Sequence, residues 1–328
     1  MRGRVPRAAR RLFLQPPDRL ERPVRAFALR DAWSRGRVLE VGRSFLAGYN
    51  AMAAADDPDE VHVRLATLEP YLRPFGYEGA AMGFGPWALM HGESHESFER
   101  VLGRLSPATV YQNYVGWGWW LGLRYRGRRR PVEAIAAGLD ARYALLVYEG
   151  IGFRAGFLSA GDRRVLERFA GLDEPARHVV HQGFGRSLWF AHMGDPGAAV
   201  REIERLPQHV RGDGYSGLGL GCAYSWLDRA AVLPGVAAQL PRAARHDFLQ
   251  GAAFGWEARQ RADPELFARF TGDLPEGLRR FIAAALAAVQ DARAAMERSG
   301  NISYQTWRAA TRERIDSAIP TEGVAHVV

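Results

Sequence analysis

The sequence predicts an all-helical protein built from about seven or eight helical hairpins of roughly 34 residues each. Two patterns support this prediction. A glycine-centred segment recurs along the chain, and short amphipathic stretches open at Asp-Pro and end near a second proline. We expect the hairpins to stack into a curved solenoid or to close into an α/α toroid.

The glycine-centred segment occurs seven times, and the intervals between its anchor glycines are 31, 37, 34, 33, 34 and 34 residues. The anchors are Gly48, Gly79, Gly116, Gly150, Gly183, Gly217 and Gly251. Segments such as GLGLGCAYSW have no charged face, so we expect them to form buried inner helices that pack closely through their glycines. The stretch around Ala285 follows one period later and is a candidate degenerate eighth copy.

The amphipathic stretches open at Asp57-Pro58, Asp195-Pro196 and Asp263-Pro264, and they end near Pro70, Pro207 and Pro275. Aspartate is a favourable N-cap, and proline is favourable at the first helical position. We therefore expect one charged outer helix in each hairpin, opened by the aspartate and stopped by the second proline.

Composition excludes several classes of site. All 44 basic residues are arginine, so the chain lacks the lysine that a phosphate-binding loop or Schiff-base chemistry requires. Cys222 is the single cysteine, which excludes an internal disulfide and a zinc cluster built from cysteines.

The excess positive charge lies at the N-terminus. Residues 1–43 contain 12 arginines and four acidic residues, whereas the remaining residues contain 32 of each. We expect a basic arm over residues 1–43 and a single helical-repeat domain over residues 44–328. The arm is expected to be separable from the fold, and an acidic carrier protein or an anionic membrane surface would be its partner, with no role in nucleic-acid binding. We expect a cytoplasmic location, with peripheral membrane contact as the alternative.

Two glutamates are candidate catalytic acids. Glu78 and Glu149 each stand in a Tyr-Glu-Gly sequence at the same place in two repeats, and Gln182 and Gln250 take that place in two others. A carboxyl group among buried helices has a raised pKa, as a general acid requires. The alternative is a structural role, in which these groups link neighbouring hairpins.

Two arginines lie beyond the anchor glycines on the predicted inner helices. Arg154 is four residues past Gly150, and Arg186 is three past Gly183. A buried arginine needs an anionic partner, which is either one of the two glutamates or a carboxylate or phosphate of a substrate.

Aromatic and amide side chains complete the predicted substrate site. They would line an apolar cavity or stabilise a developing positive charge; the alternative is that they form the core. The candidates, in addition to Arg154 and Arg186, are Tyr148, Gln182, Trp117, Trp189, Tyr224 and Trp226.

The acidic segment around Asp56, Asp57 and Glu60 resembles the aspartate-rich magnesium motif of class I terpene synthases. The repeated Asp-Pro helix start explains the same residues without a metal. We therefore expect no cofactor, and Mg²⁺ only if this segment is a diphosphate-metal site.

The phrases GYEGAAMGFG, GFGRSLWFAHMGDP, YSGLGLGCAYSW and LQGAAFGWEAR resemble the UnbL-like family, also named DUF 1702. The resemblance covers most of the chain after the basic arm. It implies a role in specialised metabolism, because members are encoded in enediyne gene clusters beside the iterative polyketide synthase. It supplies no catalytic residues that could be carried over.

Two functions fit these observations. The first is a cofactor-independent, acid-catalysed cyclase or isomerase that binds a polyene or isoprenoid chain in an aromatic-lined cavity. The second is a non-catalytic helical-repeat scaffold that docks a carrier protein or a pathway enzyme.

Overall fold

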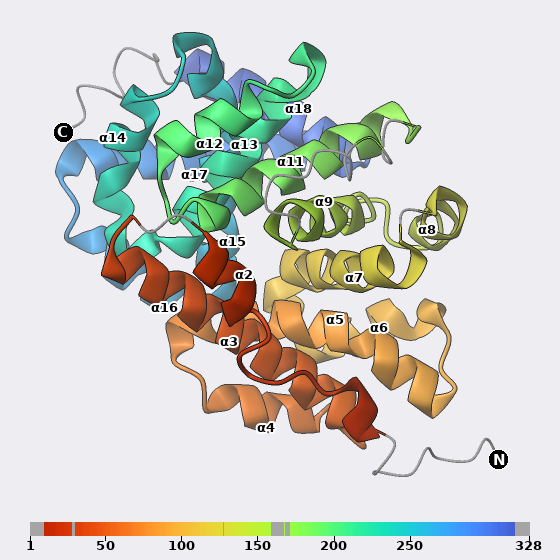
Figure 1. Cartoon of the computed structure of the whole chain (residues 1–328). Helices are drawn as coiled ribbons and strands as arrows, with labels where there is room; N and C mark the ends of the chain where they lie inside the picture. The colour runs from red at the N-terminus through yellow and green to blue at the C-terminus, as the bar shows by residue number, and fades with distance from the viewer. Residues whose placement is uncertain (1–9, 28–29, 127, 159–166, 168–170, 319–328) are drawn as a thin grey trace. The chain divides into compact units, whose positions relative to one another are not determined.

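The structure, a computed structural model, describes residues 10–27, 30–126, 128–158, 167 and 171–318. Every regular element within these ranges is a helix, which confirms the all-helical prediction for the described part of the chain (Figure 1). The α-helices are α2 (Glu21–Ala26), α3 (Ala32–Ala54), α4 (Glu60–Ala66), α5 (Arg73–His91), α6 (Phe98–Leu105), α7 (Val110–Tyr125), α8 (Arg129–Ala136), α9 (Leu146–Leu158), α11 (Glu174–Ala191), α12 (Pro196–Ile203), α13 (Gln208–Ser225), α14 (Leu233–Ala238), α15 (Arg245–Ala262), α16 (Pro264–Gly272), α17 (Glu276–Ser299) and α18 (Tyr304–Ala318).

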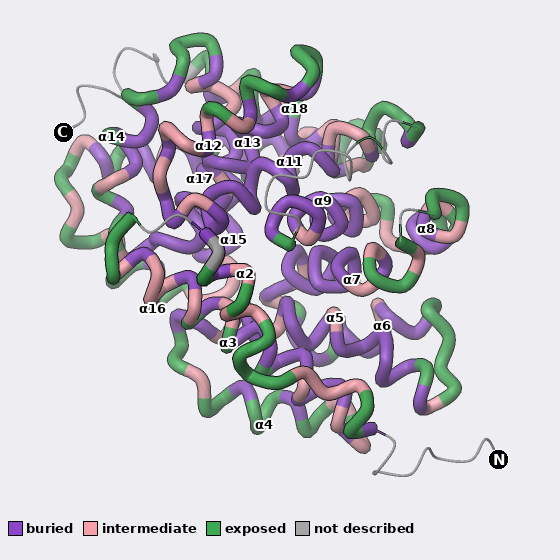
Figure 2. Tube along the Cα trace, in the orientation of Figure 1, coloured by how far each residue is buried: buried purple, intermediate pink, exposed green. Residues whose placement is uncertain are grey.

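Long and short helices alternate along the chain. From α3 to α7 and from α11 to α17, helices of 16 to 24 residues alternate with helices of six to nine residues. Most residues of the glycine-rich long helices are buried, whereas the short helices carry many of the exposed ones (Figure 2). The long helices correspond to the predicted inner helices. Solenoid or toroid closure of the array stays a prediction.

The chain forms two compact units, residues 1–151 and 152–328. In the first unit α5 packs against both α3 and α7, and in the second α13 packs against both α11 and α15. Consecutive long helices are therefore direct neighbours within each unit.

Pairs of glycines separated by one residue place successive long helices in backbone contact. A Cβ added to Gly217 would lie 1.8 Å from the carbonyl oxygen of Gln182 on α11, and one added to Gly219 would lie 1.9 Å from that of Phe248 on α15. Residues two apart in an α-helix point in nearly opposite directions, because each residue turns the helix by about 100°. The Gly-x-Gly pattern therefore packs one helix against both of its neighbours.

The same arrangement occurs in the first unit. A Cβ on Gly116 would lie 1.9 Å from the carbonyl oxygen of Glu78 on α5, and one on Gly118 would lie 2.0 Å from that of Val147 on α9. Such contacts leave no room for any side chain, which confirms the predicted close packing at these positions.

The Asp-Pro helix starts are confirmed at two of three places. The carboxylates of Asp195 and Asp263 cap α12 and α16 by accepting the backbone N–H three residues later. At Asp57-Pro58 the prediction is wrong, because α4 begins at Glu60 and Asp57 instead accepts the N–H of Asp59 in a turn.

The second prolines stand at the start of the next element, several residues after the short helix has ended. Pro207 and Pro275 are the residues before the first turns of α13 and α17, and Pro70 is the first residue of a 3₁₀ turn, Pro70–Leu72. They mark the entry of the long helix more directly than the end of the short one.

An arginine in the first turn of several long helices binds the end of the preceding short helix. Arg211, Arg245 and Arg279, spaced 34 residues apart, each follow a Leu-Pro pair and reach an acceptor seven residues earlier. Arg245 and Arg279 donate to the carbonyl oxygens of Ala238 and Gly272, which would otherwise lack a partner at a helix end. The Leu-Pro-x-x-x-Arg pattern therefore marks a recurring link between a short helix and the long helix that follows it.

A tyrosine two residues before the anchor glycine links α7 and α13 to the short helices before them. The hydroxyl of Tyr215 donates to the carboxylate of Glu204, 2.5 Å away, and that of Tyr114 makes the equivalent bond to Glu99. Burial and the neighbouring carboxylate raise the pKa of both phenols well above the ordinary value. These tyrosines are structural cross-links.

Part of the basic arm packs on α3. Arg10 is buried and pairs with Asp56 at 2.7 Å, and the hydroxyl of Tyr49 donates to the backbone oxygen of Phe13. The predicted boundary at residue 43 falls inside α3, which runs from Ala32 to Ala54. Among the described residues, no helix has the length and apolar character needed to cross a bilayer.

Candidate functional site

The two candidate glutamates are both buried, on helices that flank α7. Glu78 lies on α5 and Glu149 on α9, with 4% and 1% of their surfaces exposed. Gly116 of α7 packs against the backbone carbonyl of Glu78. Gly150, the residue after Glu149, packs against the backbone carbonyl of Val115, which is also on α7. Their convergence on one cavity stays a prediction.

The two candidate arginines differ in exposure. Arg154 on α9 is half-buried, whereas Arg186 on α11 is buried with its guanidinium carbon 4.4 Å from the ring centre of Phe153. A guanidinium over an aromatic face is a favourable cation–π contact. The choice between a structural and a substrate-binding role for these arginines stays open.

The candidate tryptophans pack against other rings. The centre of the Trp117 ring lies 5.3 Å from that of Phe84 and 5.2 Å from that of Phe98, and Trp189 and Trp226 meet edge to face at 4.6 Å. Aromatic contacts at these separations are typical of a protein core. They favour the core interpretation over an aromatic-lined cavity at these three positions.

The two candidate tyrosines are buried as well. Arg259 lies over the ring of Tyr224 at 4.3 Å and donates to the backbone oxygen of the same residue at 2.5 Å. Tyr148 is buried on α9 beside Glu149.

The acidic segment is occupied by protein contacts. Asp56 pairs with Arg10, Asp57 accepts a backbone N–H, and Glu60 pairs with Arg64 on α4 at 3.5 Å. Within the described ranges, no group of three or more His, Cys, Asp or Glu side chains is arranged to hold a metal ion.

A buried chain of hydrogen bonds crosses α11, α13 and α15. The side-chain nitrogen of Gln182 donates to the hydroxyl of Ser216 at 3.2 Å, and that hydroxyl donates to the side-chain oxygen of Gln250 at 2.7 Å. The three residues are spaced by 34, and each precedes its anchor glycine. Positions one sequence period apart therefore face one another across these helices. Ser216 is not among the predicted site residues, although the 34-residue spacing gives its place.

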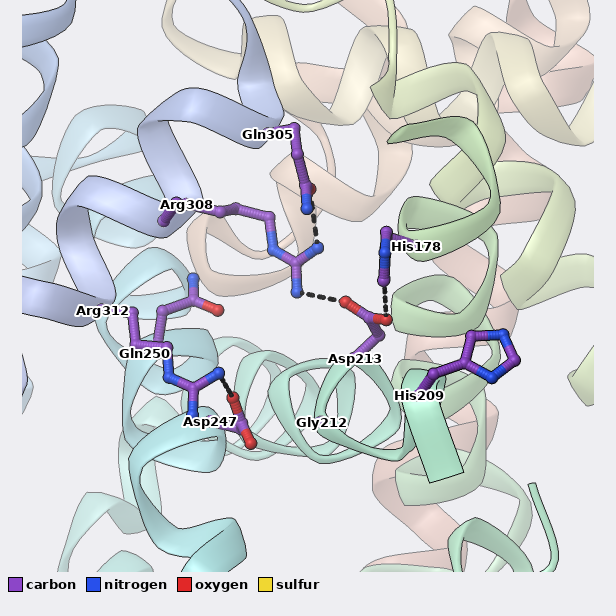
Figure 3. A pocket seen from close by; sticks show the side chains of 10 residues that line it. His178, His209, Gly212, Asp213, Asp247, Gln250, Gln305, Arg308 and Arg312 are labelled. Carbon is purple, nitrogen blue, oxygen red and sulfur yellow. Dashed lines mark hydrogen bonds and ion pairs between the residues drawn. The ribbon is translucent and has the colours of Figure 1, made fainter. Parts of the chain in front are cut away.

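This polar chain ends at a cavity of about 210 Å³ in the second unit (Figure 3). The N-terminal parts of α11, α13 and α15 form its walls, and α18 contributes the remaining side. Its polar lining comprises His178, His209, Asp213, Asp247, Gln250, Gln305, Arg308 and Arg312.

Asp213 is the centre of the cavity's charged network. Its two carboxylate oxygens bind Arg308 at 3.0 Å and Nδ1 of His178 at 2.5 Å, and Figure 3 shows both side chains pointing towards it. Asp213 and Arg308 are both buried. Whereas Asp213 and Arg308 join α13 to α18, a second pair, Arg312 and Asp247 at 2.7 Å, joins α18 to α15.

The arrangement fixes the protonation pattern of His178. An ionised carboxylate is only an acceptor, so Nδ1 must carry the proton of the His178–Asp213 bond. The ring therefore titrates at Nε2. The hydrogen bond to Asp213 raises the pKa of His178 above its ordinary value and outweighs partial burial and the charge of Arg308, which lower it.

Asp247 experiences the opposite balance. Burial raises the pKa of its carboxyl group, and this effect exceeds the lowering by Arg312 and Arg308. The cavity thus contains two groups, His178 and Asp247, whose shifts both favour the protonated form.

None of the cavity residues is among the site residues predicted from the sequence, although Gln250 takes the place of the two candidate glutamates in its segment. His178 and Asp213 lie 35 residues apart, about one period of the sequence pattern, but Arg308 lies 95 residues from Asp213 on a helix outside the seven glycine-centred segments. The spacing of a local pattern carries no information about such a contact.

Comparisons with known proteins give one match. No curated protein and no solved structure matches the chain. The family model described as "Protein of unknown function (DUF1702)" matches residues 5–315, almost the whole length. The chain therefore belongs to the DUF1702 family.

Proposed function

We propose that the protein is a cofactor-independent acid–base enzyme, a cyclase or isomerase of specialised metabolism, in which His178 transfers the proton. The observation that carries this proposal is the 2.5 Å bond between His178 and Asp213 at the edge of a polar cavity. A carboxylate that binds one ring nitrogen orients the imidazole and leaves the other nitrogen to exchange protons. The metabolic setting rests on the family resemblance.

The raised pKa of His178 suits this role. An unperturbed histidine has a pKa of about 6.5, so an upward shift keeps a substantial protonated fraction near neutral pH. The same ring can then donate a proton to a substrate and recover it later. Efficient acid–base catalysts have pKa values close to the working pH.

The cavity also supports stabilisation of negative charge. Arg308 and Arg312 enter from α18. Fixed donors in a low-dielectric site stabilise charge that develops during reaction.

The volume of the cavity limits the size of the ligand group that it can hold. Pockets for drug-sized ligands are about 300–1,000 Å³, whereas this one is about 210 Å³. It would therefore hold the polar end of a polyene or isoprenoid substrate, and the apolar chain would extend beyond it. Glu78 and Glu149 remain the alternative proton donors from the sequence.

A scaffold function is the second candidate, favoured by an exposed cluster of arginines around the α7–α8 connection. Its members are Arg124, Arg126, Arg128, Arg129 and Arg130. Glu133 pairs with Arg129 at 3.1 Å, so the cluster keeps a strong positive excess. Such a surface suits an acidic carrier protein.

Complementation of a gene deletion in the native host tests the catalytic proposal. His178→Gln and Asp213→Asn should accumulate the same intermediate as the deletion, with an immunoblot to show that each protein is present. His246→Gln is the matched control, because His246 also pairs with an aspartate of α18, Asp316, but does not line the cavity. Normal product from stable His178→Gln protein would reject the proposal, and loss of product after neutralising the Arg124–Arg130 cluster would then favour the scaffold.

A further inference from the structure

Two buried donors line the cavity without an acceptor in the described structure. The side-chain nitrogen of Gln250 and Nε of Arg308 make no hydrogen bond, although the residues are only 3% and 6% exposed. Both side chains line the cavity. Buried donors in native proteins are almost always paired, so these two point to an acceptor that the chain does not supply.

The hydrogen-bond chain fixes which end of Gln250 faces the ligand. Ser216 accepts from Gln182 and therefore gives its single hydroxyl proton to the oxygen of Gln250. The amide nitrogen of Gln250 is left to donate. A position predicted from the repeat thus has a defined chemical role at the cavity.

The charge balance admits an anion. Arg308 and Arg312 offset Asp213 and Asp247, and His178 adds positive charge when protonated. Glu174, 3.8 Å from Nε2 of His178, is the further acidic group close to that ring.

From these observations we infer that the cavity binds a carboxylate group of the substrate, with Gln250 and Arg308 as its donors. A carboxylate presents about four lone-pair sites and no proton, so it satisfies both donors. A neutral amide carries no negative charge, so it gains less than a carboxylate from the guanidinium of Arg308 and from protonated His178. This inference rests on the proposed function for the identity of the substrate, and it makes that substrate a carboxylic acid whose acid end lies beside His178.

Isothermal titration of the purified full-length protein with hexanoate, hexanamide and inorganic phosphate tests the inference. Hexanoate should bind, hexanamide should bind about tenfold or more weakly, and Gln250→Leu should weaken hexanoate binding by a similar factor. Gln239→Leu is the control, because Gln239 is exposed on α14 and bonds to its own helix. Hexanoate should also bind more weakly as the pH rises and His178 loses its proton.

Three results would overturn the inference: no hexanoate binding, equal binding by Gln250→Leu, or phosphate binding tighter than hexanoate. Each is separable from the proposed function. If His178→Gln still abolishes product while hexanoate fails to bind, His178 remains the proton carrier and the carboxylate assignment is wrong. If hexanoate binds as expected while His178→Gln makes normal product, the site binds acids and the catalytic proposal is wrong.

Discussion

At the scale of single residues, the titration of His178 links the cavity to stability. Its folded-state pKa is raised above the ordinary value of 6.5 by the hydrogen bond to Asp213. A raised pKa means that the folded state binds the proton more tightly than the unfolded state. The stabilisation is therefore fully present below about pH 6.5 and is lost as the pH rises through the folded-state pKa.

Because the pKa of His178 is raised on folding, its contribution to stability should fall as the pH rises. The difference in unfolding free energy between wild type and His178→Gln should be largest near pH 5.5 and should shrink towards pH 9. Urea denaturation across this range measures it. His209→Gln is the control, since His209 lines the same cavity but is exposed. A difference in unfolding free energy that stays constant with pH would mean that the bond to Asp213 does not raise the pKa of His178.

At the scale of helices, the glycines of the Gly-x-Gly pattern control packing. A Cβ on Gly217 would lie 1.8 Å from the carbonyl oxygen of Gln182 and 2.6 Å from the nitrogen of Arg186, both backbone atoms that cannot move aside. Gly217→Ala should therefore destabilise the protein by about 1–3 kcal/mol or more, as overpacking does.

Gly235 provides the contrasting substitution. It lies within the short helix α14, and a Cβ there would meet nothing within 4 Å. Gly235→Ala should raise stability by about 0.5–1 kcal/mol, because alanine loses less backbone entropy in a helix. Thermal unfolding of both variants checks the pair. Equal stability of Gly217→Ala and wild type would contradict backbone contact between α11 and α13.

The helix contacts that the sequence predicts are those between positions one period apart. The period of the anchor glycines identified the long helices, the close contact at Gly217, and the alignment of Gln182 with Gln250, because each depends on local spacing. The cavity depends on Arg308 and Arg312, which come from α18 after the periodic pattern has ended. For the tryptophans, the sequence identified the residues but not their role, because apolar rings suit a protein core and a substrate cavity equally well.

At the scale of the whole molecule, removal of the N-terminal arm tests where the folded unit begins. The sequence predicts that the basic arm is separable from the fold, so that removing residues 1–30 should leave unfolding nearly unchanged. The described contacts lead to a different expectation, because Val24 and Phe27 are buried and Arg10 pairs with Asp56. Removal of residues 1–30 should cost about 3 kcal/mol or more, from two lost apolar side chains alone.

Calorimetric unfolding of the truncated protein measures this cost. Deletion of residues 1–9 is the control, because it keeps Arg10 and the other contacts described for the arm. Unchanged unfolding after removal of residues 1–30 would restore the original prediction of a separable arm.

Chemical rescue of a His178 variant tests whether His178 transfers a proton in the cavity beside α18. The substrate would be the intermediate that accumulates in the deletion strain, incubated with purified His178→Ala protein in the presence and absence of imidazole. We expect no conversion without imidazole and a pH-dependent return of conversion when imidazole occupies the space left by the ring. Wild-type conversion by His178→Ala alone, or a loss that imidazole leaves unchanged in a fully folded protein, would mean that His178 does not transfer the proton.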